Sequence, residues 1–484
     1  MERSDECGFL RRRRHPVTLS PGLPVSLPLL CFSFWNPPNL GYNCSKWVQD
    51  KATIVQKGFR QVKKSGVLVL LLLLLPVQIK ELGIAASHSL PKTVRAVEPL
   101  QALSDYVNVI QQRGQDPAAQ GVLIETLDGS ERLADHNADV TFNPASVMKL
   151  ATSLTALSRL GPDYRYRTNV LADGTIDQGS RVLEGDLVIE GGADPMFSLY
   201  DAEEVALQIS KLGVSHVRGS LRFCGQFYFF AHGYHSNLSL ETSASKLRAS
   251  IQRAGIRIEG ETVFGAKSGT LLLSHYSDPL VSILLYQNAH SSNAVAEVVG
   301  ASLGGPHAIQ EYLVDKLNLS DSDLFVGRAS GLDFNRITPV ATLKVLRSLI
   351  KVLGDHSLQP EDVMAVAGID SGTMRGRLFR DDLRGAVVAK TGTLVSIDNG
   401  VSTLVGIAYT KARGPVLFAV FNSGGSVHAY RRLQDQFVEQ MIAEEGGALS
   451  PRRNEDALAD DTRHSIVQVF YRSAGDVPSE VGAE

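Results

Sequence analysis

Three short motifs follow one another along this chain, and together they hold the residue types of an acyl-serine enzyme. The first pairs Ser146 with Lys149, the second pairs Ser291 with Asn293, and the third begins at Lys390. They supply a nucleophilic hydroxyl, an amine three residues away, a second hydroxyl for proton relay, an amide and a cation. Serine chemistry of this kind needs no His–Asp pair, because a neutral lysine can take the proton. The motifs and their order therefore predict an acyl-transfer site.

The third motif has the composition of a carboxylate-binding strand. Lys390, Thr391, Gly392 and Thr393 directly follow an apolar, β-prone run over residues 386–389. A cation and two hydroxyls suit a carboxylate, and the glycine permits a close approach of ligand or backbone. The alternative is an edge strand whose lysine only discourages pairing with other chains.

Context favours Ser146 over a second serine with the same spacing to a lysine. Ser146 opens an apolar helix expected over residues 143–157, where Lys149 stands one turn from the hydroxyl. Desolvation there lowers the affinity of the amine for its proton. Ser243 and Lys246 instead lie in a polar stretch, where the lysine is expected to stay hydrated. The alternative for Ser146 is an ordinary helix cap.

The second motif lies at a junction between two expected helices, over residues 279–286 and 294–299. A polar sequence at such a junction is often only a cap. The presence of the other two motifs favours a functional role for Ser291 and Asn293.

Composition and charge limit the other classes of function. The 484 residues are 44% hydrophobic and 7% aromatic, which is ordinary for a globular protein of two or three domains. Residues 1–65 hold 11 basic and 4 acidic residues, which leaves 37 basic and 47 acidic residues for the rest. An acidic body argues against nucleic acid as a partner. Nucleophile elbows, zinc-protease motifs and phosphate loops are also absent from the sequence.

Cysteine usage predicts neither a disulfide nor a metal in the body of the protein. Three of the four cysteines lie in the first 44 residues, and only Cys224 remains beyond them. One cysteine cannot form an intrachain disulfide. Because the spacings typical of zinc ligands are missing as well, we expect no metal and no other cofactor.

The N-terminal region reads as a secretory signal with an unusual extension in front of it. Four basic residues between 57 and 64 precede an apolar run over residues 66–77, and small residues follow at 83–87. The pattern predicts export to the periplasm or the outer face of the envelope, with cleavage near residue 87. A retained membrane anchor is the alternative, although the run is short for one. Residues 1–50 show no clear periodicity and stand in front of the signal, and the next methionine is Met148, so translation is expected to start at a non-Met codon near residues 48–55. If Met1 is the true start, the segment is expected to be a disordered cytoplasmic extension.

The body reads as one α+β domain interrupted by another. Strands are expected over residues 121–127, 132–136, 401–409 and 415–422, and an amphipathic helix over 427–444. Tight connections between consecutive strands imply an antiparallel sheet flanked by helices. The expected division is a leader over 1–87, a first part over 88–170, an inserted domain over 171–274, a second part over 275–447 and a mobile tail over 448–484.

The inserted domain is expected to be smaller and mostly β. Its glycines and short alternating runs indicate strands and loops, with one helix near residues 202–212. The tail is charged and poor in apolar residues, which is typical of a mobile segment. Only residues 466–471 within it have the composition of a strand.

At its motifs the chain resembles the D-alanyl-D-alanine carboxypeptidase/endopeptidase family, the low-molecular-mass class C penicillin-binding proteins. The likeness covers about residues 95–445. Besides the three motifs, ordered matches occur at residues 144–150, 183–195, 330–332, 335–339, 366–370, 372–373 and 389–394. The resemblance implies a penicilloyl-serine transferase fold with a domain inserted between the first and second motifs.

The resemblance also implies a role for each residue. Ser146 attacks the penultimate D-Ala carbonyl of a peptidoglycan stem peptide, and Lys149 takes its proton. Ser291 relays a proton to the leaving amine, and Asn293 holds the substrate amide. The terminal carboxylate binds the third motif, and the backbone N–H groups of Ser146 and Thr393 form the oxyanion hole. β-Lactams are the expected covalent inhibitors.

Some positions depart from the family pattern. Arg328 and Ala329 stand where the family has an acidic residue and a glycine, and the loop after them is one residue short. Ser371 is an insertion, and residues 397–399 lengthen the turn after the third motif. These departures concern loop contacts and substrate preference. Two other functions stay open at this point, a serine β-lactamase and a non-catalytic wall-binding relative.

Overall fold

The computed structural model describes residues 100–230, 238–449, 451–459 and 464–471. These belong to the compact unit Thr93–Glu484. The predicted signal, its cleavage near residue 87, the alternative start at residues 48–55 and the first three cysteines lie outside the described residues. Within the described ranges, no helix is both long enough and apolar enough to cross a membrane.

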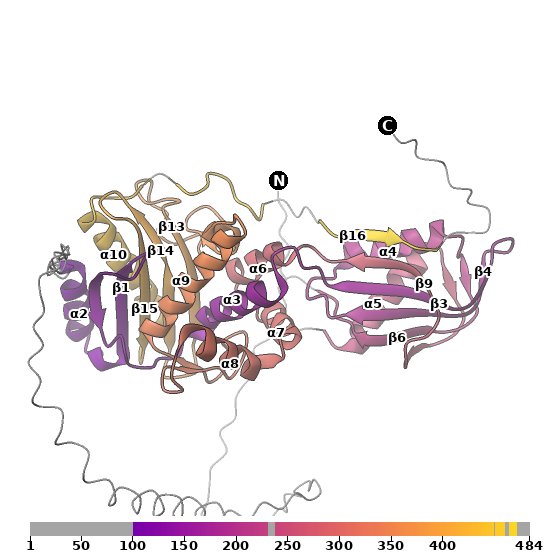
Figure 1. Cartoon of the computed structure of the whole chain (residues 1–484), viewed down its shortest axis with the longest axis horizontal. Coiled ribbons are helices and arrows are strands. Elements are labelled where there is room, and N and C mark those ends of the chain that lie inside the picture. Colours follow the sequence, from indigo (N-terminus) through magenta and orange to yellow (C-terminus); the bar gives the residue numbers. More distant parts are fainter. Residues whose placement is uncertain (1–99, 231–237, 450, 460–463, 472–484) are drawn as a thin grey trace, which may run out of the picture. The chain divides into compact units, whose positions relative to one another are not determined.

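A six-stranded antiparallel sheet forms the centre of the domain that carries the three motifs. Its strand order is β12-β13-β14-β15-β1-β2, so the two ends of the domain sequence meet where β15 pairs with β1 (Figure 1). The strands are β1 Gln120–Thr126, β2 Arg132–His136, β12 Ala365–Val366, β13 Val387–Leu394, β14 Val401–Thr410 and β15 Gly414–Ser423. The expected antiparallel sheet is confirmed.

Helices cover both faces of this sheet, which explains why β14 is buried at all its positions (Figure 1). Side chains alternate across a strand. Leu123 therefore packs in one core with α3 and α9, whereas Val122 and Ile124 pack in a second core with α2 and α10. The helices are α2 Gln101–Gln112, α3 Met148–Leu160, α6 Leu280–Ala289, α7 Asn293–Ser302, α8 Gly305–Leu317, α9 Pro339–Asp355 and α10 Val427–Glu444.

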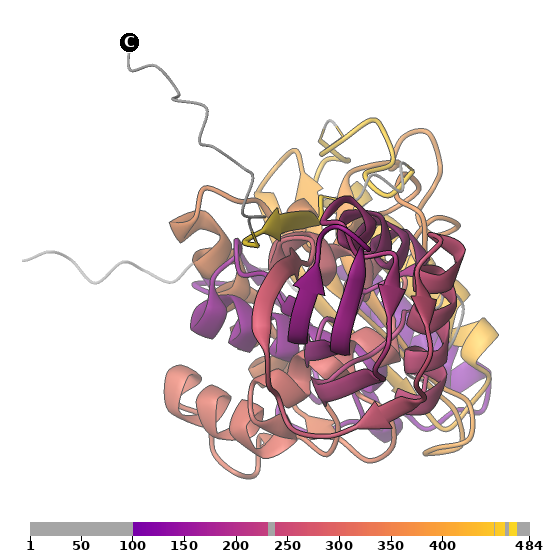
Figure 2. The same ribbon diagram turned by 90° about the vertical axis from the view of Figure 1, so that its right-hand side faces the viewer.

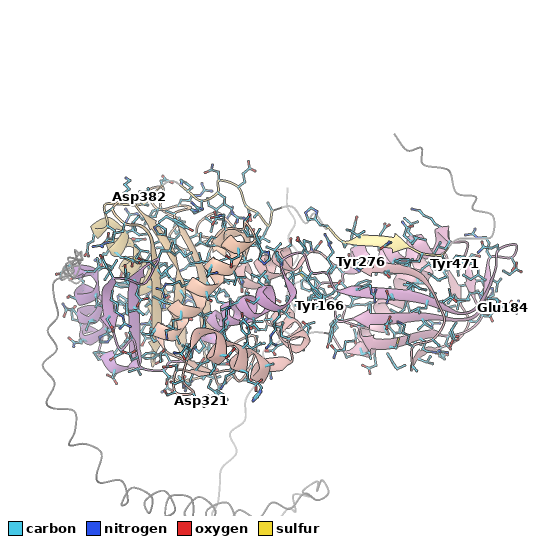
Figure 3. All side chains as sticks on the ribbon, in the orientation of Figure 1. Tyr166, Glu184, Tyr276, Asp321, Asp382 and Tyr471 are labelled. Carbon is cyan, nitrogen blue, oxygen red and sulfur yellow. The ribbon has the colours of Figure 1, made fainter. Side chains whose placement is uncertain are left out.

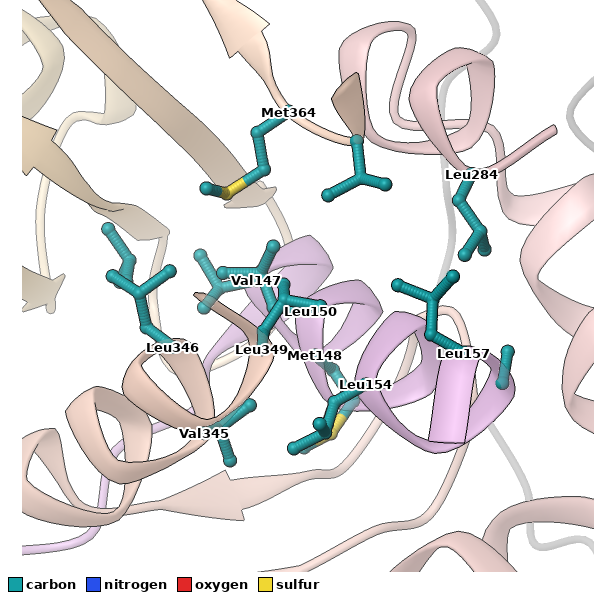
Figure 4. Packing of buried hydrophobic residues seen from close by; sticks show 14 of the residues in the cluster. Val147, Met148, Leu150, Leu154, Leu157, Leu284, Val345, Leu346, Leu349 and Met364 are labelled. Carbon is teal, nitrogen blue, oxygen red and sulfur yellow. The ribbon is translucent and has the colours of Figure 1, made fainter. Parts of the chain in front are cut away.

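Helix α3 runs through the first of these cores and is buried on every side along Met148 to Leu157. Figure 4 shows Leu150 of α3 among Leu346 and Leu349 of α9, with Met364 close by. Helix α9 begins sharply because Thr338 caps it, accepting from the N–H of Ala341 at 3.0 Å. This packing holds the start of α3, and thus the first motif, in one orientation.

Short elements connect these layers. They are the 3₁₀ turns η1 Pro117–Ala119, η2 Ala145–Val147 and η3 Pro360–Asp362, and the paired strands β10 Leu324–Phe325 and β11 Arg336–Ile337. Turn η2 carries Ser146 directly in front of α3.

A second sheet, mixed and eight-stranded, accounts for the inserted segment. Figure 2 looks onto this sheet and its helices. Two helices, α4 Leu199–Lys211 and α5 Leu240–Arg253, pack on a core of their own. The strands are β3 Arg167–Asp177, β4 Val182–Gly192, β5 His216–Val217, β6 Leu221–Gln226, β7 Arg257–Ile258, β8 Thr262–Phe264, β9 Thr270–Tyr276 and β16 Ile466–Val469.

This sheet differs from the expected inserted domain in two ways. The expected boundaries at 170/171 and 274/275 fall inside β3 and β9, because both strands extend further to pair with each other. Helix α5 was not expected at all. Its buried residues, such as Ala244, Leu247 and Ile251, have helical spacing, but the polar residues between them hide the pattern.

The expectation of a mobile tail over residues 448–484 does not hold for its described part. Strand β16 pairs with β9, and Tyr276 (Figure 3) stands opposite Ile466 in the register. Arg452 forms an ion pair with Glu361 at 2.9 Å, and Asp456 accepts from Ser371 Oγ at 2.5 Å. The charged residues of this segment, which suggested mobility, instead form contacts with polar side chains of the motif-bearing domain.

Candidate active site

The nucleophile segment has an unusual backbone conformation. Ala145, the residue before Ser146, has a φ of +47°, in the left-handed region that side chains seldom adopt. The Oδ1 atom of Asn143 accepts from the N–H of Ala145 at 3.0 Å, and Thr403 Oγ1 donates to Pro144 O at 2.8 Å. Contacts from both sides thus hold a strained turn in place. Ser146 is left half-buried while its neighbours are buried.

Lys149 joins the first motif to the second. Its fully buried Nζ lies 2.9 Å from Ser146 Oγ, 2.7 Å from Asn293 Oδ1 and 2.6 Å from Ser330 O. A neutral amine has two N–H bonds and one lone pair. The N–H bonds suit the amide and carbonyl oxygens of Asn293 and Ser330, so the lone pair is left to face the Ser146 hydroxyl.

Burial sets the protonation of this amine. It lowers the pKa of Lys149 to about 7, and the negative charge of Glu297 partly opposes the shift. An amine with such a pKa is partly neutral at neutral pH, which suits a general base. Ser146 and Lys149 thus have the spacing and the lowered amine pKa that a nucleophile and its base require.

Glu297 is a residue that reasoning from the sequence missed. It lies on α7, one helical turn after Asn293, and accepts from Ser330 Oγ at 2.5 Å and from Ser330 N at 3.2 Å. Arg328 Nε also donates to it, at 3.3 Å. Its spacing from Asn293 was the available signal, because residues four apart share a helix face.

Lys390 is placed like Lys149, in full burial beside a serine. Its Nζ donates to Ser291 Oγ at 2.9 Å and to Thr391 O at 2.7 Å. Burial, and then the nearby charge of Lys149, lower the pKa of Lys390 well below its usual range. Ser291 has a φ of +56°, so it is, after Ala145, a second motif-region residue in the left-handed region. Because Ser291 Oγ accepts from Lys390, its own proton remains to be donated elsewhere.

Two glycines bring neighbouring segments against the nucleophile turn. A Cβ on Gly392 would lie 2.5 Å from Pro144 O and 2.0 Å from Thr403 Oγ1. A Cβ on Gly331, whose φ is +81°, would lie 1.9 Å from Ala145 O. Side chains cannot approach backbone so closely, so both positions require glycine. Strand β13 therefore lies directly beside the segment that carries Ser146.

The structure brings the predicted residues of the three motifs close together. Ser146, Lys149 and Asn293 share a hydrogen-bond network, and Lys390 of strand β13 donates to Ser291, which lies between α6 and α7. Thr391, Gly392 and Thr393 continue β13 along the same edge, opposite Leu404, Thr403 and Ser402 of β14. Thr391 Oγ1 donates to Thr373 Oγ1 at 2.9 Å.

The competing serine lies elsewhere. Ser243 is on α5 and its buried Oγ accepts from the N–H of Phe229 at 3.0 Å. Lys246, three residues on, is exposed. Ser243 thus has a structural role in that core, and its lysine is solvated as expected.

The departures from the family pattern have identifiable contacts. Arg328 pairs with Glu297, and its guanidinium lies 3.8 Å from Asp333. In the lengthened turn, Asp398 pairs with Arg336 at 3.2 Å. The inserted Ser371 binds Asp456 of the C-terminal segment. These substitutions exchange one set of loop contacts for another and leave the three motifs in place.

Removing the charge of Glu297 is expected to lower the pKa of Lys149, since a nearby anion stabilises the ammonium form. We predict that the pH–rate profile for acylation of Ser146 by a penicillin rises through about pH 7 in the wild type. In Glu297→Gln its midpoint moves to lower pH. Asp333→Asn is the control, because it removes a carboxylate that faces the same Arg328. An unchanged or raised midpoint in Glu297→Gln would show that the glutamate does not influence the base.

Comparisons with known proteins identify the family of the chain. Residues 103–225 and 238–443 match the D-Ala-D-Ala carboxypeptidase 3 (S13) family. The chain is 21% identical to the D-alanyl-D-alanine carboxypeptidase DacB of Haemophilus influenzae, over 66% of this chain and 88% of that protein. It is 36% identical to a D-alanyl-D-alanine carboxypeptidase of Actinomadura, over 22% of this chain and only 20% of that protein.

Solved structures with the same fold include a penicillin-binding protein and a peptidoglycan endopeptidase. Penicillin-binding protein 4 of Haemophilus influenzae superimposes with a TM-score of 0.57 at 19% identity, covering 70% of this chain and 98% of that one. A predatory peptidoglycan endopeptidase of Bdellovibrio bacteriovorus gives 0.59 at 24% identity, covering 69% and 95%. The expected α+β fold is confirmed. By its sequence match over both parts of the motif-bearing domain, the chain belongs to the D-Ala-D-Ala carboxypeptidase 3 (S13) family.

Proposed function

We propose that this protein is a serine DD-peptidase that cleaves peptidoglycan stem peptides through an acyl-enzyme on Ser146. One observation carries the proposal: the buried amine of Lys149 lies 2.9 Å from Ser146 Oγ and has a pKa of about 7. A base of that pKa within hydrogen-bond reach activates a serine without histidine. Membership of the family supports the same reaction class.

Acylation begins when the Lys149 amine takes the proton of Ser146. Ser146 Oγ then attacks the penultimate D-Ala carbonyl, and the new C–O bond pushes the carbonyl electrons onto oxygen. The backbone N–H groups of Ser146 and Thr393 are the proposed oxyanion hole. As the C–N bond breaks, Ser291 gives its proton to the leaving amine and regains one from Lys390 Nζ, which bonds it at 2.9 Å.

Deacylation returns both protons to their starting places. Water attacks the ester carbonyl, and Ser291 passes the proton of that water to Lys390. Lys149, protonated since the first step, gives its proton to the departing Ser146 oxygen. During acylation Lys149 thus gains a proton, whereas Lys390 loses one, and deacylation reverses both transfers. The lowered pKa of each lysine makes its neutral form accessible. The net reaction consumes one water and releases D-Ala.

The substrate is held by the remaining residues of the motifs. Asn293 binds the amide that precedes the cleaved bond, and the strand that carries Lys390, Thr391 and Thr393 is the proposed place for the terminal carboxylate. A cross-linked peptide whose leaving residue presents a D-centre carboxylate in the same place would be cut as well. β-Lactams would acylate Ser146, in keeping with a penicillin G-acylated structure of the Bdellovibrio endopeptidase.

Labelling with a fluorescent penicillin tests the nucleophile. Ser146→Ala is expected to abolish the covalent adduct and the release of D-Ala from a pentapeptide, because no other hydroxyl contacts Lys149 in the described structure. Ser243→Ala is the matched control and should label like the wild type. Rapid penicillin turnover without peptide cleavage would indicate a β-lactamase instead. Peptidoglycan binding without any adduct would indicate a non-catalytic wall-binding protein.

We propose in addition that the protein is exported, because its substrate lies outside the cytoplasmic membrane. The basic flank, apolar run and small residues over 57–87 support export. N-terminal sequencing of protein from the cell envelope should find a start between about residues 85 and 90, given the usual cleavage pattern. Recovery of envelope protein that still carries residues 57–80 would favour a retained anchor.

A further inference from the structure

An arginine that none of the motifs contains stands at the end of the carboxylate-binding strand. Arg431 of α10 donates from Nη2 to Thr393 Oγ1 at 2.9 Å. Its neighbour Asp435 is paired with Arg377 at 2.7 Å. Among the residues that the structure describes, no carboxylate forms an ion pair with Arg431. The guanidinium is thus a half-buried cation, and the carboxylate that interacts with it electrostatically within the described residues, Asp435, forms its ion pair with Arg377 instead.

A cavity of about 440 Å³ opens beside this pair. Thr393, Val395, Val427, His428 and Arg431 contribute to its wall. The wall of the cavity is mainly apolar. A carboxylate placed at Thr393 would lie next to the guanidinium of Arg431, which stays positively charged. The volume is ample for an amino-acid residue that carries such a carboxylate.

Lys390, the other cation of the strand, is less suited to bind a carboxylate by charge. It is fully buried and already donates to Ser291 Oγ and Thr391 O. Burial beside Lys149 lowers its pKa well below the usual range, which reduces the share of its charged form. A guanidinium stays protonated in any protein environment, and its planar donors match a carboxylate.

The hydrogen bonds of the two strand hydroxyls also favour a carboxylate next to Arg431. Thr391 Oγ1 already donates its proton to Thr373 Oγ1. Thr393 Oγ1 accepts from Arg431, so its own proton remains for a ligand. A carboxylate at this point would receive one bond from Thr393 and one or two from the guanidinium.

We propose that Arg431 is a specificity-determining residue that binds the free carboxylate of the leaving residue together with Thr393. The assignment rests on the proposed DD-peptidase function. On this assignment, a residue of α10, outside the three motifs, selects substrates that have a free terminal carboxylate. Lys390 then serves mainly to supply Ser291 with its proton.

The test compares two substrates that differ only at the terminus: an acyl-Lys-D-Ala-D-Ala peptide and its C-terminal amide. For the wild type, kcat/KM should favour the acid by roughly ten- to a hundredfold, as a charge-assisted contact provides. In Arg431→Gln we expect kcat/KM for the acid to fall by most of that factor, while kcat/KM for the amide stays unchanged. Arg431→Lys should keep part of the preference, because charge remains but the bidentate geometry is lost.

The matched control is Arg432→Gln, which removes an exposed arginine from the next position of the same helix. It should retain the full preference for the acid. A merely structural role for Arg431 would lower the rates of both substrates equally and leave their ratio intact. The unchanged cleavage of the amide also shows that the Arg431→Gln protein is folded.

Acylation by a penicillin and by its carboxylate methyl ester gives an independent readout of the same ratio. In Arg431→Gln the ratio of the acylation rates of acid and ester should fall by about the same factor as the ratio of kcat/KM for the two peptides. An active wild type whose acid preference survives Arg431→Gln would overturn the assignment while the proposed function stands. A wild type that neither releases D-Ala nor forms an adduct would overturn both.

Discussion

Two buried lysine amines near one another impose the arrangement of the residues around them. Lys149 and Lys390 are both fully buried, and an amine removed from water is costly unless acceptors surround it. The hydrogen-bond partners of Lys149 come from Ser146, Asn293 and Ser330, which are far apart in the sequence. Helices α3 and α7 and the loop at Ser330 must therefore meet for the amine to be tolerated. The contacts that make the burial possible are also the contacts that create the base.

The same constraint explains the strained backbone. Ala145 and Ser291 have positive φ values, and Gly331 and Gly392 approach the nucleophile turn more closely than any side chain permits. Such features persist only where the surroundings enforce them. Here they aim two hydroxyls at the two buried amines. We regard the strain as the structural cost of placing both serines within hydrogen-bond reach.

Much of this site could be predicted from the sequence, because motif residues lie on elements with strong local patterns. Helix α10 spans the expected residues 427–444, and β13 carries the third motif as expected. Thr373 and Arg431 could not be assigned this way, and for Glu297 the spacing from Asn293 was the available signal. Each of them acts through contacts between segments that are distant in the sequence, such as Arg431 with Thr393. The strand expected within residues 466–471 is present as β16, but its pairing with β9, almost two hundred residues earlier, could not be predicted.

The central claim is that Lys149 is a base with a depressed pKa, and its titration tests this directly. Protein labelled with ¹³C at the lysine Cε can be followed by NMR across pH 5 to 11, with Lys149→Met to identify the resonance. We predict that the Lys149 signal titrates near pH 7, well below the solvent-exposed lysines. A midpoint close to the ordinary lysine value of about 10.4 would contradict the account, because the amine would then be charged when the serine must be activated.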